Sequence, residues 1–532
     1  MRKIIYRAFI TVGCVILAGT MLVSCTFESA FVDLIQEKIN ADLGITSEEI
    51  VPVTGITLDK PNLTVTSGYT EQLTAVIEPP EAADQSAAWS SSDESVAEVD
   101  DAGMVTGTGP GSATITAAAS GGDVTARCEV LVLPKGEFDT SFNTVGYVRQ
   151  ELNEQGGWNA VHIDTQDRIL VTGWAGDLFG DKDMYACRFV SSGSPDQTFS
   201  IDGIISYEQA SSPDTGCDII TDSSGRVIIA GKIGNGPDFV DLAVWRYKEN
   251  GNTDLDFTTV VYEGSVTSDS DVANGIVLDN SGKIIVAGYT RIGTDADIII
   301  QRYNDDGTPN ISFGDEGTVT RDHGETDWCY SVALDDDGKI VAAGRIYSGS
   351  DSDLGVWRFN SNGSPDNSFD DDGAAIYGSA ELGNTNNSGL DVLVDGNGKI
   401  LVVGQNYDGS DYYVILVRLN EDGSLDTSFG TGGKVQYNHG FKFNSGYGLC
   451  LDEAGNILVT GRVDVDASFN GRLAVWRYLP DGSPDPTFGS GGVFVCDDGI
   501  SGTGSGIAAD ADGKIIVAGS SSGGQNIVYR FK

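Results

Sequence analysis

The sequence predicts an all-β protein in which a β-sandwich precedes a seven-bladed β-propeller. Three observations support this prediction. A unit that is clearest from Asp279 to Phe313 recurs seven times, its apolar runs are rich in β-branched residues, and the units show no helical periodicity. A period of this length indicates an array of supersecondary units.

A glycine at the end of an apolar run marks each unit, and the steps between these glycines are 56 to 60 residues. An aspartate stands 9 residues before each glycine, and in six of the seven units another glycine follows that aspartate after three residues. Asp at the first and Gly at the fourth position favour a type I turn, so two short strands should meet there in a hairpin. The marker glycines are Gly173, Gly231, Gly288, Gly344, Gly404, Gly461 and Gly519, and the aspartates are Asp164, Asp222, Asp279, Asp335, Asp395, Asp452 and Asp510.

Two further strands are expected in every unit. The run Lys283 to Ala287 is continuously apolar, as in a strand buried on both faces. A third strand, Asp297 to Tyr303, ends in an Arg-aromatic pair, and a turn at Asp306 to Pro309 leads past Phe313 to a fourth strand. Four antiparallel strands in each of seven units favour a propeller, because radial packing buries both faces of every small sheet.

One regular pair of residues predicts how the ring closes. Arginines at the end of the third strand are followed, 8 residues later, by an aspartate or asparagine, which gives the pairs Arg188 and Asp196, Arg246 and Asp254, Arg302 and Asn310, Arg358 and Asp366, Arg418 and Asp426, and Arg477 and Asp485. Arg530 has no such successor before Lys532, whereas Asp139 has the successor's sequence without a preceding arginine. We expect the segment from Phe138 to about Val148 to supply the outer strand of the last blade, with Asp139 near Arg530. This arrangement would remove an open sheet edge.

Residues 1–24 predict a signal peptide. Basic residues at Arg2, Lys3 and Arg7 precede an apolar run from about Ala8 to Val23. The residues ending in Cys25, Leu-Val-Ser-Cys, resemble a bacterial lipobox, which implies cleavage before Cys25 and a diacylglyceryl group on its sulfur. The absence of an aspartate after Cys25 resembles the signal for the outer membrane. We therefore expect a lipid-anchored protein of the bacterial cell envelope, in the outer membrane or at the cell surface; an uncleaved anchor is the alternative.

Residues 25–50 are expected to form a lipidated tether with a short amphipathic helix. From residue 51 to 134 Thr, Ser, Val and Ala alternate in about seven short runs with turn signals such as Asp59 to Pro61, which predicts a β-sandwich. The order of these motifs, including Trp89 to Asp93 and Gly111 to Ala117, resembles the bacterial immunoglobulin-like group 2 domain (BIG2). That resemblance implies a spacer or adhesive module. Trp89 is expected to be a core residue, and the single Cys128 excludes an inter-sheet disulfide within this domain.

Residues 135–532 are assigned to the propeller. Segments such as 421–434, Glu-Asp-Gly-Ser-Leu-Asp-Thr-Ser-Phe-Gly-Thr-Gly-Gly-Lys, resemble the bacterial delta-60 repeat, a propeller-type family without an assigned activity. Both resemblances inform the architecture far more than the function, because one fold supports many activities.

The charge argues against two classes of partner. The formal net charge is −46, and removal of the three basic residues of the signal peptide would make it −46 − 3 = −49. Such a charge disfavours nucleic acid and bare anionic lipid and favours cationic partners or Ca²⁺. Apart from Cys14 and Cys25, six cysteines are scattered without metal-site spacing, so no disulfide framework or zinc site is expected.

Three sets of residues are candidates for specific roles. The Arg and Asp pairs are expected to be structural. Acid-rich turns containing Asp335, Asp337, Asp510 and Asp512 could supply hard oxygen ligands for Ca²⁺, although none completes an EF-hand loop and aspartates commonly form turns. The innermost strands should line the axial channel, with Asn159, Asp218, Asn274 and Asp391 as candidate lining residues. His162 is expected in the core, and His323 and His439 stand in stretches between blades with no recurring acid or nucleophile beside them.

The preferred functional hypothesis is a monomeric cell-surface lipoprotein that binds or adheres to an extracellular protein or glycan through a propeller held off the membrane by the Ig-like spacer. The alternatives are an envelope-anchored enzyme acting on polysaccharide or peptide in the channel, and a structural envelope component. No catalytic residues, nucleophile with a partner base, or Gly-rich phosphate loop can be identified, which favours binding over catalysis.

Overall fold

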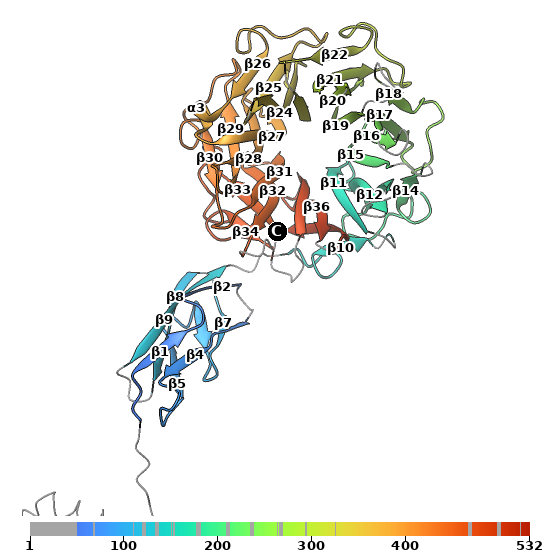
Figure 1. Ribbon diagram of the computed structural model, residues 1–532. Coiled ribbons are helices and arrows are strands. Elements are labelled where there is room, and N and C mark those ends of the chain that lie inside the picture. The colour runs from blue at the N-terminus through green and yellow to red at the C-terminus, as the bar shows by residue number, and fades with distance from the viewer. Residues whose placement is uncertain are drawn as a thin grey trace, which may run out of the picture.

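A small β-domain precedes a ring of β-sheets in the computed structural model (Figure 1). The structure describes residues 51–531 except 67–69, 110, 120–123, 134–137, 151, 153–154, 177–181, 209–212, 235–238, 263, 265–269, 293–294, 325, 350, 467–470, 497–501 and 522. The predicted signal peptide, Cys25 and the tether lie outside the described residues. No helix in the described ranges is long and apolar enough to cross a membrane.

The first domain is a sandwich of short strands. The described residues form nine of them, rather than about seven: β1 (Gly55–Leu58), β2 (Asn62–Thr66), β3 (Thr70–Gln72), β4 (Ala75–Glu78), β5 (Ala87–Ser91), β6 (Ala97–Val99), β7 (Met104–Gly107), β8 (Gly111–Ala119) and β9 (Thr125–Leu133). They pair as β2-β9-β8-β5, β3-β7-β6 and β1-β4. Buried and more exposed residues alternate along β8, as expected for a strand with one face on the core.

Trp89 contributes to this core as predicted, although its ring is only partly buried. It packs against two apolar clusters, one around Val130 and the other around Ile77. The backbone of Gly103 approaches the ring so closely that an added Cβ would lie 2.7 Å from it, and φ at this residue is +82°. Glycine is therefore required here. Cys128 is buried in the same core as a free thiol.

The remaining strands form seven four-stranded antiparallel sheets within the described ranges, which confirms the predicted all-β, propeller-like architecture. In order from the axis outward, blade 1 is β11 (Gln155–Ile163), β12 (Ile169–Gly176), β13 (Lys182–Phe189) and β14 (Ile204–Tyr207); blade 2 is β15 (Thr215–Thr221), β16 (Val227–Gly234), β17 (Val240–Tyr247) and β18 (Val260–Tyr262); blade 3 is β19 (Ser270–Leu278), β20 (Ile284–Ile292), β21 (Asp295–Tyr303) and β22 (Thr318–Arg321); blade 4 is β23 (Asp327–Leu334), β24 (Ile340–Ser348), β25 (Asp351–Phe359) and β26 (Ala374–Tyr377). Blade 5 is β27 (Thr385–Val394), β28 (Ile400–Tyr407), β29 (Tyr412–Leu419) and β30 (Lys434–Tyr437); blade 6 is β31 (Asn444–Leu451), β32 (Ile457–Asp464), β33 (Gly471–Tyr478) and β34 (Val493–Val495); blade 7 is β35 (Gly502–Ala509), β36 (Ile515–Ser521), β37 (Asn526–Phe531) and β10 (Tyr147–Gln150).

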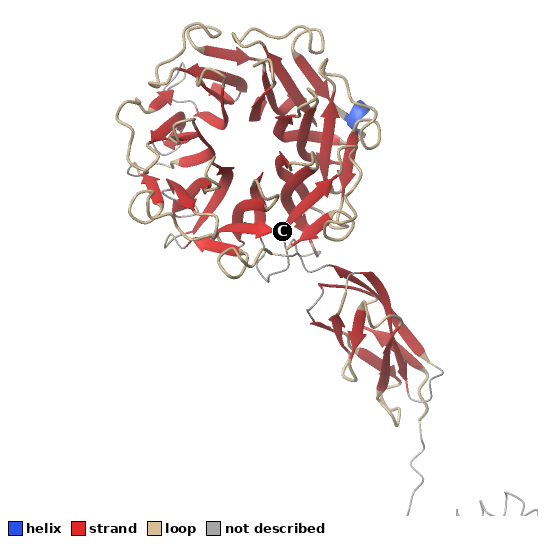
Figure 2. Ribbon diagram, turned by 180° about the vertical axis from the view of Figure 1, so that it is seen from behind, coloured by secondary structure: helices blue, strands red, loops and turns tan. Residues whose placement is uncertain are grey.

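The antiparallel order gives the ring two different faces. The hairpins between the first and second strands and the turns between the third and fourth strands lie on one face, which we call the hairpin face. The opposite face carries the connections from second to third strands and from each blade to the next, and we call it the cavity face. One four-residue helix, α3 (Ser379–Leu382), interrupts the otherwise all-β described ranges (Figure 2). It lies in a blade-to-blade connection that departs from the repeat.

On the hairpin face, the repeated arginine holds several elements together. In blade 1, Arg188 Nε lies 2.8 Å from Asp196 Oδ2, and its guanidinium carbon lies 4.5 Å from the centre of the Phe199 ring. Arg188 Nη1 also donates to the carbonyl oxygen of Glu249, which belongs to blade 2, at 2.6 Å. The second oxygen of Asp196 accepts hydrogen bonds from the backbone and side chain of Thr198. One side chain thus fixes a turn and joins two blades.

This arginine node recurs around the ring. A phenylalanine lies under the guanidinium at 4.5 to 4.9 Å in all seven blades, in the pairs Arg188 and Phe199, Arg246 and Phe257, Arg302 and Phe313, Arg358 and Phe369, Arg418 and Phe429, Arg477 and Phe488, and Arg530 and Phe142. Blade 3 differs in that Arg302 Nη2 meets the neutral Asn310 at 3.2 Å. The sequence reveals the Arg and Asp spacing but not the bond to the following blade.

The N-terminal segment of the propeller closes the ring. Strand β10 pairs with β37 in antiparallel register, with Val148 opposite Val528. Asp139 lies 2.8 Å from Arg530 in an ion pair, and its backbone nitrogen donates to the carbonyl oxygen of Arg530 at 2.9 Å. The paired strand begins only at Tyr147 and continues to Gln150, so it lies later than the predicted 138–148. The earlier residues instead supply the Asp and Phe of the seventh arginine node.

We predict that Asp139→Ala weakens this closure. Both partners are less than a tenth exposed, and leaving Arg530 buried without its carboxylate should lower the free energy of unfolding by about 2–4 kcal/mol. Hydrogen exchange should show that β37 and β10 open locally at a free energy lower than that of global unfolding. The matched control is Asp485→Ala, which removes the same pair from blade 6, where the third and fourth strands are directly connected. Equal protection of β37 in both variants would contradict the closing role of Asp139.

Candidate functional site

Every innermost strand contains one bulge at the same place. At this place the register with the second strand skips one residue in each blade, and in blade 5 the innermost strand has a further irregularity between Thr385 and Ser388. A bulge turns a side chain away from the regular alternation and is frequent beside functional sites. The seven bulge residues are Asn159, Cys217, Asn274, Tyr330, Leu390, Tyr447 and Ser505.

All seven bulge residues line a single cavity of about 540 Å³, which we call the axial cavity. Figure 1 shows β11, β15, β19, β27 and β31 around the central opening of the ring. The rest of the lining comes from early positions of innermost strands, from late positions of second strands and from the start of β13, so the cavity lies toward the cavity face. These other lining residues are Trp174, Lys182, Thr215, Lys232, Val272, Tyr289, Trp328 and Thr503.

Aromatic side chains from blades 3 and 4 form one wall of the axial cavity. The Trp328 ring centre lies 5.9 Å from that of Tyr289 and 6.3 Å from that of Tyr330, which meets it edge-on. Arg345 lies 3.9 Å from the same indole ring and supports it by a cation–π contact. Burial raises the pKa of Tyr289, Tyr330 and Tyr447 above the ordinary value for tyrosine, so these phenols stay neutral at physiological pH.

Two lysines provide the charged groups of the lining. Lys182 begins β13 in blade 1, and its Nζ lies 4.1 Å from the centre of the Trp174 ring. Lys232 lies on β16 in blade 2, opposite Thr215 of the innermost strand. Burial lowers the pKa of Lys182, and the positive charge of Lys232 lowers it further. Within the described residues, neither lysine has an ion-pair partner.

The four predicted channel residues occupy two adjacent columns of the repeat, where a column is one position compared across the seven aligned units. Asn159 and Asn274 are bulge residues and line the axial cavity. Their side-chain amides also donate to backbone oxygens of the next blade, Asn159 to Gly216 at 2.8 Å and Asn274 to Cys329 at 2.7 Å. They therefore combine exposure to the cavity with a bond between blades.

Asp218 and Asp391 follow the bulges and join blades rather than line the axial cavity. Asp218 accepts a hydrogen bond from Ile276 N of blade 3 at 2.9 Å, and Asp391 accepts one from Leu449 N of blade 6 at 2.8 Å. Ser331 of blade 4 also donates to Asp391, at 2.6 Å. Burial raises the pKa of Asp218 to about 7, with a smaller contribution from the charge of Asp391, and burial raises the pKa of Asp391 to about 6.

The remaining bulge residues were not identified from the sequence. Cys217, Tyr330, Leu390, Tyr447 and Ser505 stand in the same column as Asn159 and Asn274, 14 residues before the marker glycine of each unit. The column mixes polar, aromatic and apolar types, so composition did not mark it. Aligning the seven units on that glycine and selecting this variable column would have found the set.

The aspartates predicted to bind Ca²⁺ act as turn formers. Asp335 Oδ1 accepts hydrogen bonds from the backbone nitrogens of Asp337 and Lys339, and Asp510 Oδ1 accepts the equivalent bonds from Asp512 and Lys514. The structure does not gather Asp335 with Asp337, or Asp510 with Asp512, into a group of three or more acidic ligands within its described residues.

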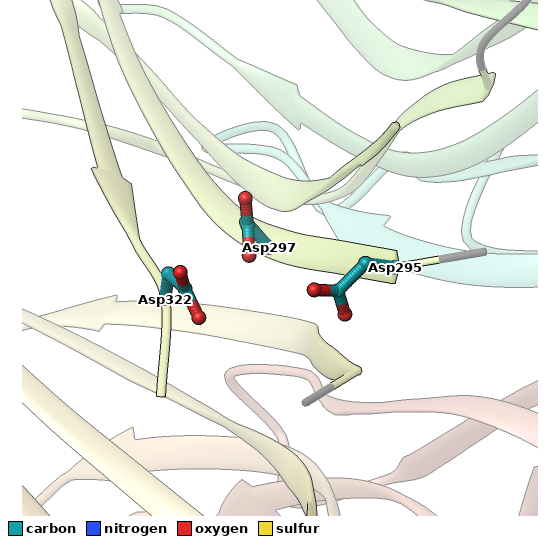
Figure 3. A group of neighbouring side chains, drawn as sticks. All are labelled: Asp295, Asp297 and Asp322. Carbon is teal, nitrogen blue, oxygen red and sulfur yellow. The ribbon is translucent and has the colours of Figure 1, made fainter. Parts of the chain in front are cut away.

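Another group of acids has its oxygens closer together. Asp295 and Asp297 of β21 and Asp322 after β22 each place one oxygen within 4.8 Å of the other two (Figure 3). Burial and, to a smaller extent, the negative charges of Asp322 and Asp295 raise the pKa of Asp297 to about 6. Calcium binding stays a prediction, and it is not supported at the four positions chosen from the sequence.

The histidines do not form a catalytic group in the described structure. His162 Nε2 contacts Thr221 Oγ1 at 2.9 Å, and burial lowers the pKa of His162. His439 contacts the hydroxyl of Tyr437. His323 Nδ1 lies 3.2 Å from Asp327 Oδ2. The same Asp327 oxygen accepts a hydrogen bond from the backbone nitrogen of His323, which indicates a structural turn.

The raised pKa of Asp218 predicts a pH-dependent stability. Since folding raises this pKa from 3.8 to about 7, the folded protein keeps a proton that the unfolded chain releases, and the contribution to stability is lost as pH rises through this window. Asp218→Asn removes the titration and retains an acceptor for Ile276. The stability of the variant relative to wild type should therefore increase by about 1–3 kcal/mol from about pH 4.5 to pH 8, measured by urea unfolding.

The control for this titration is Asp336→Asn, which changes an exposed acid on the hairpin face. Its stability difference from wild type should stay nearly constant over the same pH range. A constant difference for Asp218→Asn as well would contradict the raised pKa.

Two family comparisons match separate parts of the chain. The bacterial Ig-like domain (group 2) matches residues 52–130. A domain of unknown function described as the DUF5122 beta-propeller matches residues 280–313, 336–369, 396–429, 455–488 and 511–532. Both predicted resemblances are confirmed, and the first indicates a bacterial surface or extracellular protein.

Similarity to individual proteins is more limited. An alpha-L-arabinofuranosidase of Bifidobacterium longum is 42% identical over 94 residues, which are 18% of this chain and 9% of the length of that protein. The chain therefore spans less than a tenth of this curated relative.

Solved structures with related folds have low sequence identity. A protein of unknown function from Dyadobacter fermentans is 10% identical with a TM-score of 0.38, over 73% of this chain and 97% of that one. The polysaccharide lyase Uly1 is 10% identical with a TM-score of 0.40, over 70% and 89% of the two chains. The microbial sialidase Hz136 is 12% identical with a TM-score of 0.37, over 66% and 73%.

The matched segments coincide with the two structural parts described above. The first lies within the sandwich formed by β1 to β9, and the others begin at the hairpins of five successive propeller units and run through their arginine nodes. The chain thus contains a bacterial Ig-like domain of group 2 followed by DUF5122 beta-propeller repeats.

Proposed function

We propose that this protein is a lipid-anchored bacterial surface protein that binds an extracellular glycan in the axial cavity. The observation that carries the proposal is the convergence of seven bulge residues, one from each blade, on a single cavity with aromatic and polar walls. Ligand sites are commonly concave and combine aromatic surface with a few placed polar groups. The bulge in each innermost strand directs one side chain into the cavity and leaves the pairing of the second strand with the third unchanged.

The chemistry of the lining supports a glycan. Sugars present apolar C–H surfaces on their ring faces and hydroxyl groups at their edges. The rings of Trp328 and Tyr330 supply flat apolar surface, while the amides of Asn159 and Asn274 and the hydroxyl of Thr503 supply hydrogen-bonding groups. A protein ligand would need a wider contact area than a cavity of about 540 Å³ provides.

The contrast between the two faces also supports this location. Arginine nodes and aspartate-capped hairpins repeat across the hairpin face, where packing constrains the sequence. Connections on the cavity face vary in length and composition, and two further cavities open there. One, of about 650 Å³, shares Trp328 with the axial cavity, and the other, of about 420 Å³, is lined by aromatic residues including Tyr412 and Phe443. Loops free of packing constraints commonly carry function.

The domain order supports display at a surface. The Ig-like domain lies between the predicted anchor at Cys25 and the propeller, and can act as a spacer. The strong negative charge of the chain favours solubility and disfavours adsorption to anionic lipid. In this proposal the acyl chains at Cys25 hold the protein at the membrane, since several chains bind far more firmly than one.

An enzyme acting on polysaccharide is the second candidate, because Asp218 and Asp391 combine raised pKa values with positions close to the axis. Both carboxyl groups accept backbone hydrogen bonds from the next blade, and neither lines the axial cavity. A general acid has to reach the bond that it protonates. The geometry therefore favours binding over hydrolysis, and chromatography of the incubated glycan would reveal shortened products if the enzyme hypothesis were correct.

The proposed anchor predicts fatty acylation at Cys25. Cells that express the full chain and grow with an alkyne-tagged fatty acid should yield a labelled protein, and Cys25→Ser should abolish the label because the thioether cannot form. Cys14→Ser is the matched control, since Cys14 lies in the same apolar segment but before the predicted cleavage site. Labelling of the Cys25→Ser variant would exclude the proposed lipid site.

The proposed binding site predicts that changes in the axial cavity reduce glycan binding. Trp328→Ala removes stacking surface and should weaken binding by about tenfold or more on a glycan array and in calorimetry. Ser505→Phe fills the cavity without removing an aromatic ring and should have a similar effect. Leu255→Ala, on the hairpin face where this side chain is 87% exposed, is the control and should bind as wild type does. Unchanged binding in both cavity variants would place the ligand elsewhere, and absence of any glycan ligand would contradict the proposed function.

A further inference from the structure

The charged lining of the axial cavity has the opposite sign to the rest of the molecule. The chain contains 78 Asp and Glu residues against 32 Lys and Arg residues. Among the described residues, Lys182 and Lys232 line the axial cavity and no carboxylate does. A cavity that concentrates positive charge within an acidic protein is suited to an anionic ligand, because that ligand meets repulsion nearly everywhere else.

Among the residues that the structure describes, the two ammonium groups have no neutralising partner. No described carboxylate lies within ion-pair distance of either lysine, whereas lysines elsewhere in the ring, such as Lys339 and Lys399, pair with Asp366 and Asp426 of the arginine nodes. Lys182 is instead held over the Trp174 ring at 4.1 Å. The lowered pKa of Lys182, caused by burial and then by Lys232, is consistent with an unbalanced pair that an anion would stabilise.

The aromatic wall faces the same cavity from other blades. Lys182 and Lys232 come from blades 1 and 2, while Tyr289, Trp328 and Tyr330 come from blades 3 and 4. A ligand that fills the cavity therefore meets cationic groups from one part of the ring and flat apolar rings from another. Amide and hydroxyl groups of the lining, from blades 1, 2, 3 and 7, can also form hydrogen bonds with neutral polar groups of the same ligand.

We propose that the axial cavity selects an acidic saccharide, with the carboxylate of a uronate residue bound by Lys182 and Lys232 and a sugar ring resting on the aromatic wall. This inference rests on the proposed function and adds the class of glycan. A nucleotide would also combine an anion with a flat ring, but the neutral amide and hydroxyl groups of the lining match a ligand with many hydroxyls. Charge-assisted hydrogen bonds from the two lysines give the acidic sugar its advantage over a neutral one.

The test uses a panel of uronate trisaccharides, neutral trisaccharides with the same linkages, and a nucleoside diphosphate, each titrated into the full chain by calorimetry. The wild type should bind a uronate trisaccharide at least tenfold more tightly than its neutral counterpart and more tightly than the nucleotide. Affinity for the uronate should fall as salt rises, because the lysines are partly exposed.

The lysine double variant Lys182→Met with Lys232→Met keeps the length of both side chains and should lose at least tenfold in affinity for the uronate while binding the neutral sugar as wild type does. Its melting temperature should equal or exceed that of wild type, since it removes repulsion between like charges. Lys248→Met, which changes an exposed lysine on the hairpin face, is the control and should not alter binding.

The outcomes separate the inference from the proposed function. Equal affinity for acidic and neutral sugars, with no effect of the double variant, would overturn the acidic class and leave glycan binding intact. Tighter binding of the nucleotide would also overturn the inference. Failure of every saccharide in the panel to bind would overturn both proposals.

Discussion

The arginine node is the interaction on which the rest of this propeller depends. The arginine near the end of each third strand holds a carboxylate or amide, which in six blades belongs to the turn that follows it. It also stacks on a phenylalanine and, in most blades, donates to a backbone oxygen of the following blade. Arg530 and Asp139 make the last node between residues that are almost the whole propeller apart in sequence. Because such buried pairs are costly to break, they fix the hairpin face and close the ring without an exposed sheet edge.

Fixing one face leaves the other free to vary. The second strands are buried on both sides and the nodes hold the outer turns, so the innermost strands can each accommodate a bulge. These bulges turn seven side chains toward the axis, while neighbouring residues such as Asp218 and Asp391 bond between blades. The site therefore does not compete with the interactions that stabilise the blades. This division of roles explains how one regular fold can present a chemically irregular cavity.

Much of the fold could be predicted from the sequence, because packing repeats the same residue types at the same spacing. The marker glycines, the aspartate turns and the unmatched Arg530 and Asp139 indicated seven blades and their closure. The exact closing strand was misplaced because the seventh node uses the residues before Tyr147. The helix α3 was missed because four residues carry no periodicity.

The site was less predictable from the sequence. A bulge shifts a strand by one residue and thereby changes which of the equivalent positions in the seven units faces the axis. The lining residues chosen from the sequence came from two columns, and only Asn159 and Asn274 line the cavity. The lysines were missed because they lie on the second and third strands and come close only when blades 1 and 2 pack together. The acid-rich turns were candidate Ca²⁺ sites because a turn capped by aspartates and a metal-binding loop have similar sequences.

Bulge residues from all seven blades form the proposed glycan site at the axis. The most direct measurement is an experimental structure of the full chain with a bound uronate trisaccharide. We expect sugar density in the axial cavity, with the carboxylate beside Lys182 and Lys232 and a ring against Trp328. Density on the hairpin face, or a sugar bound to the Ig-like domain with the axial cavity filled only by water, would contradict it.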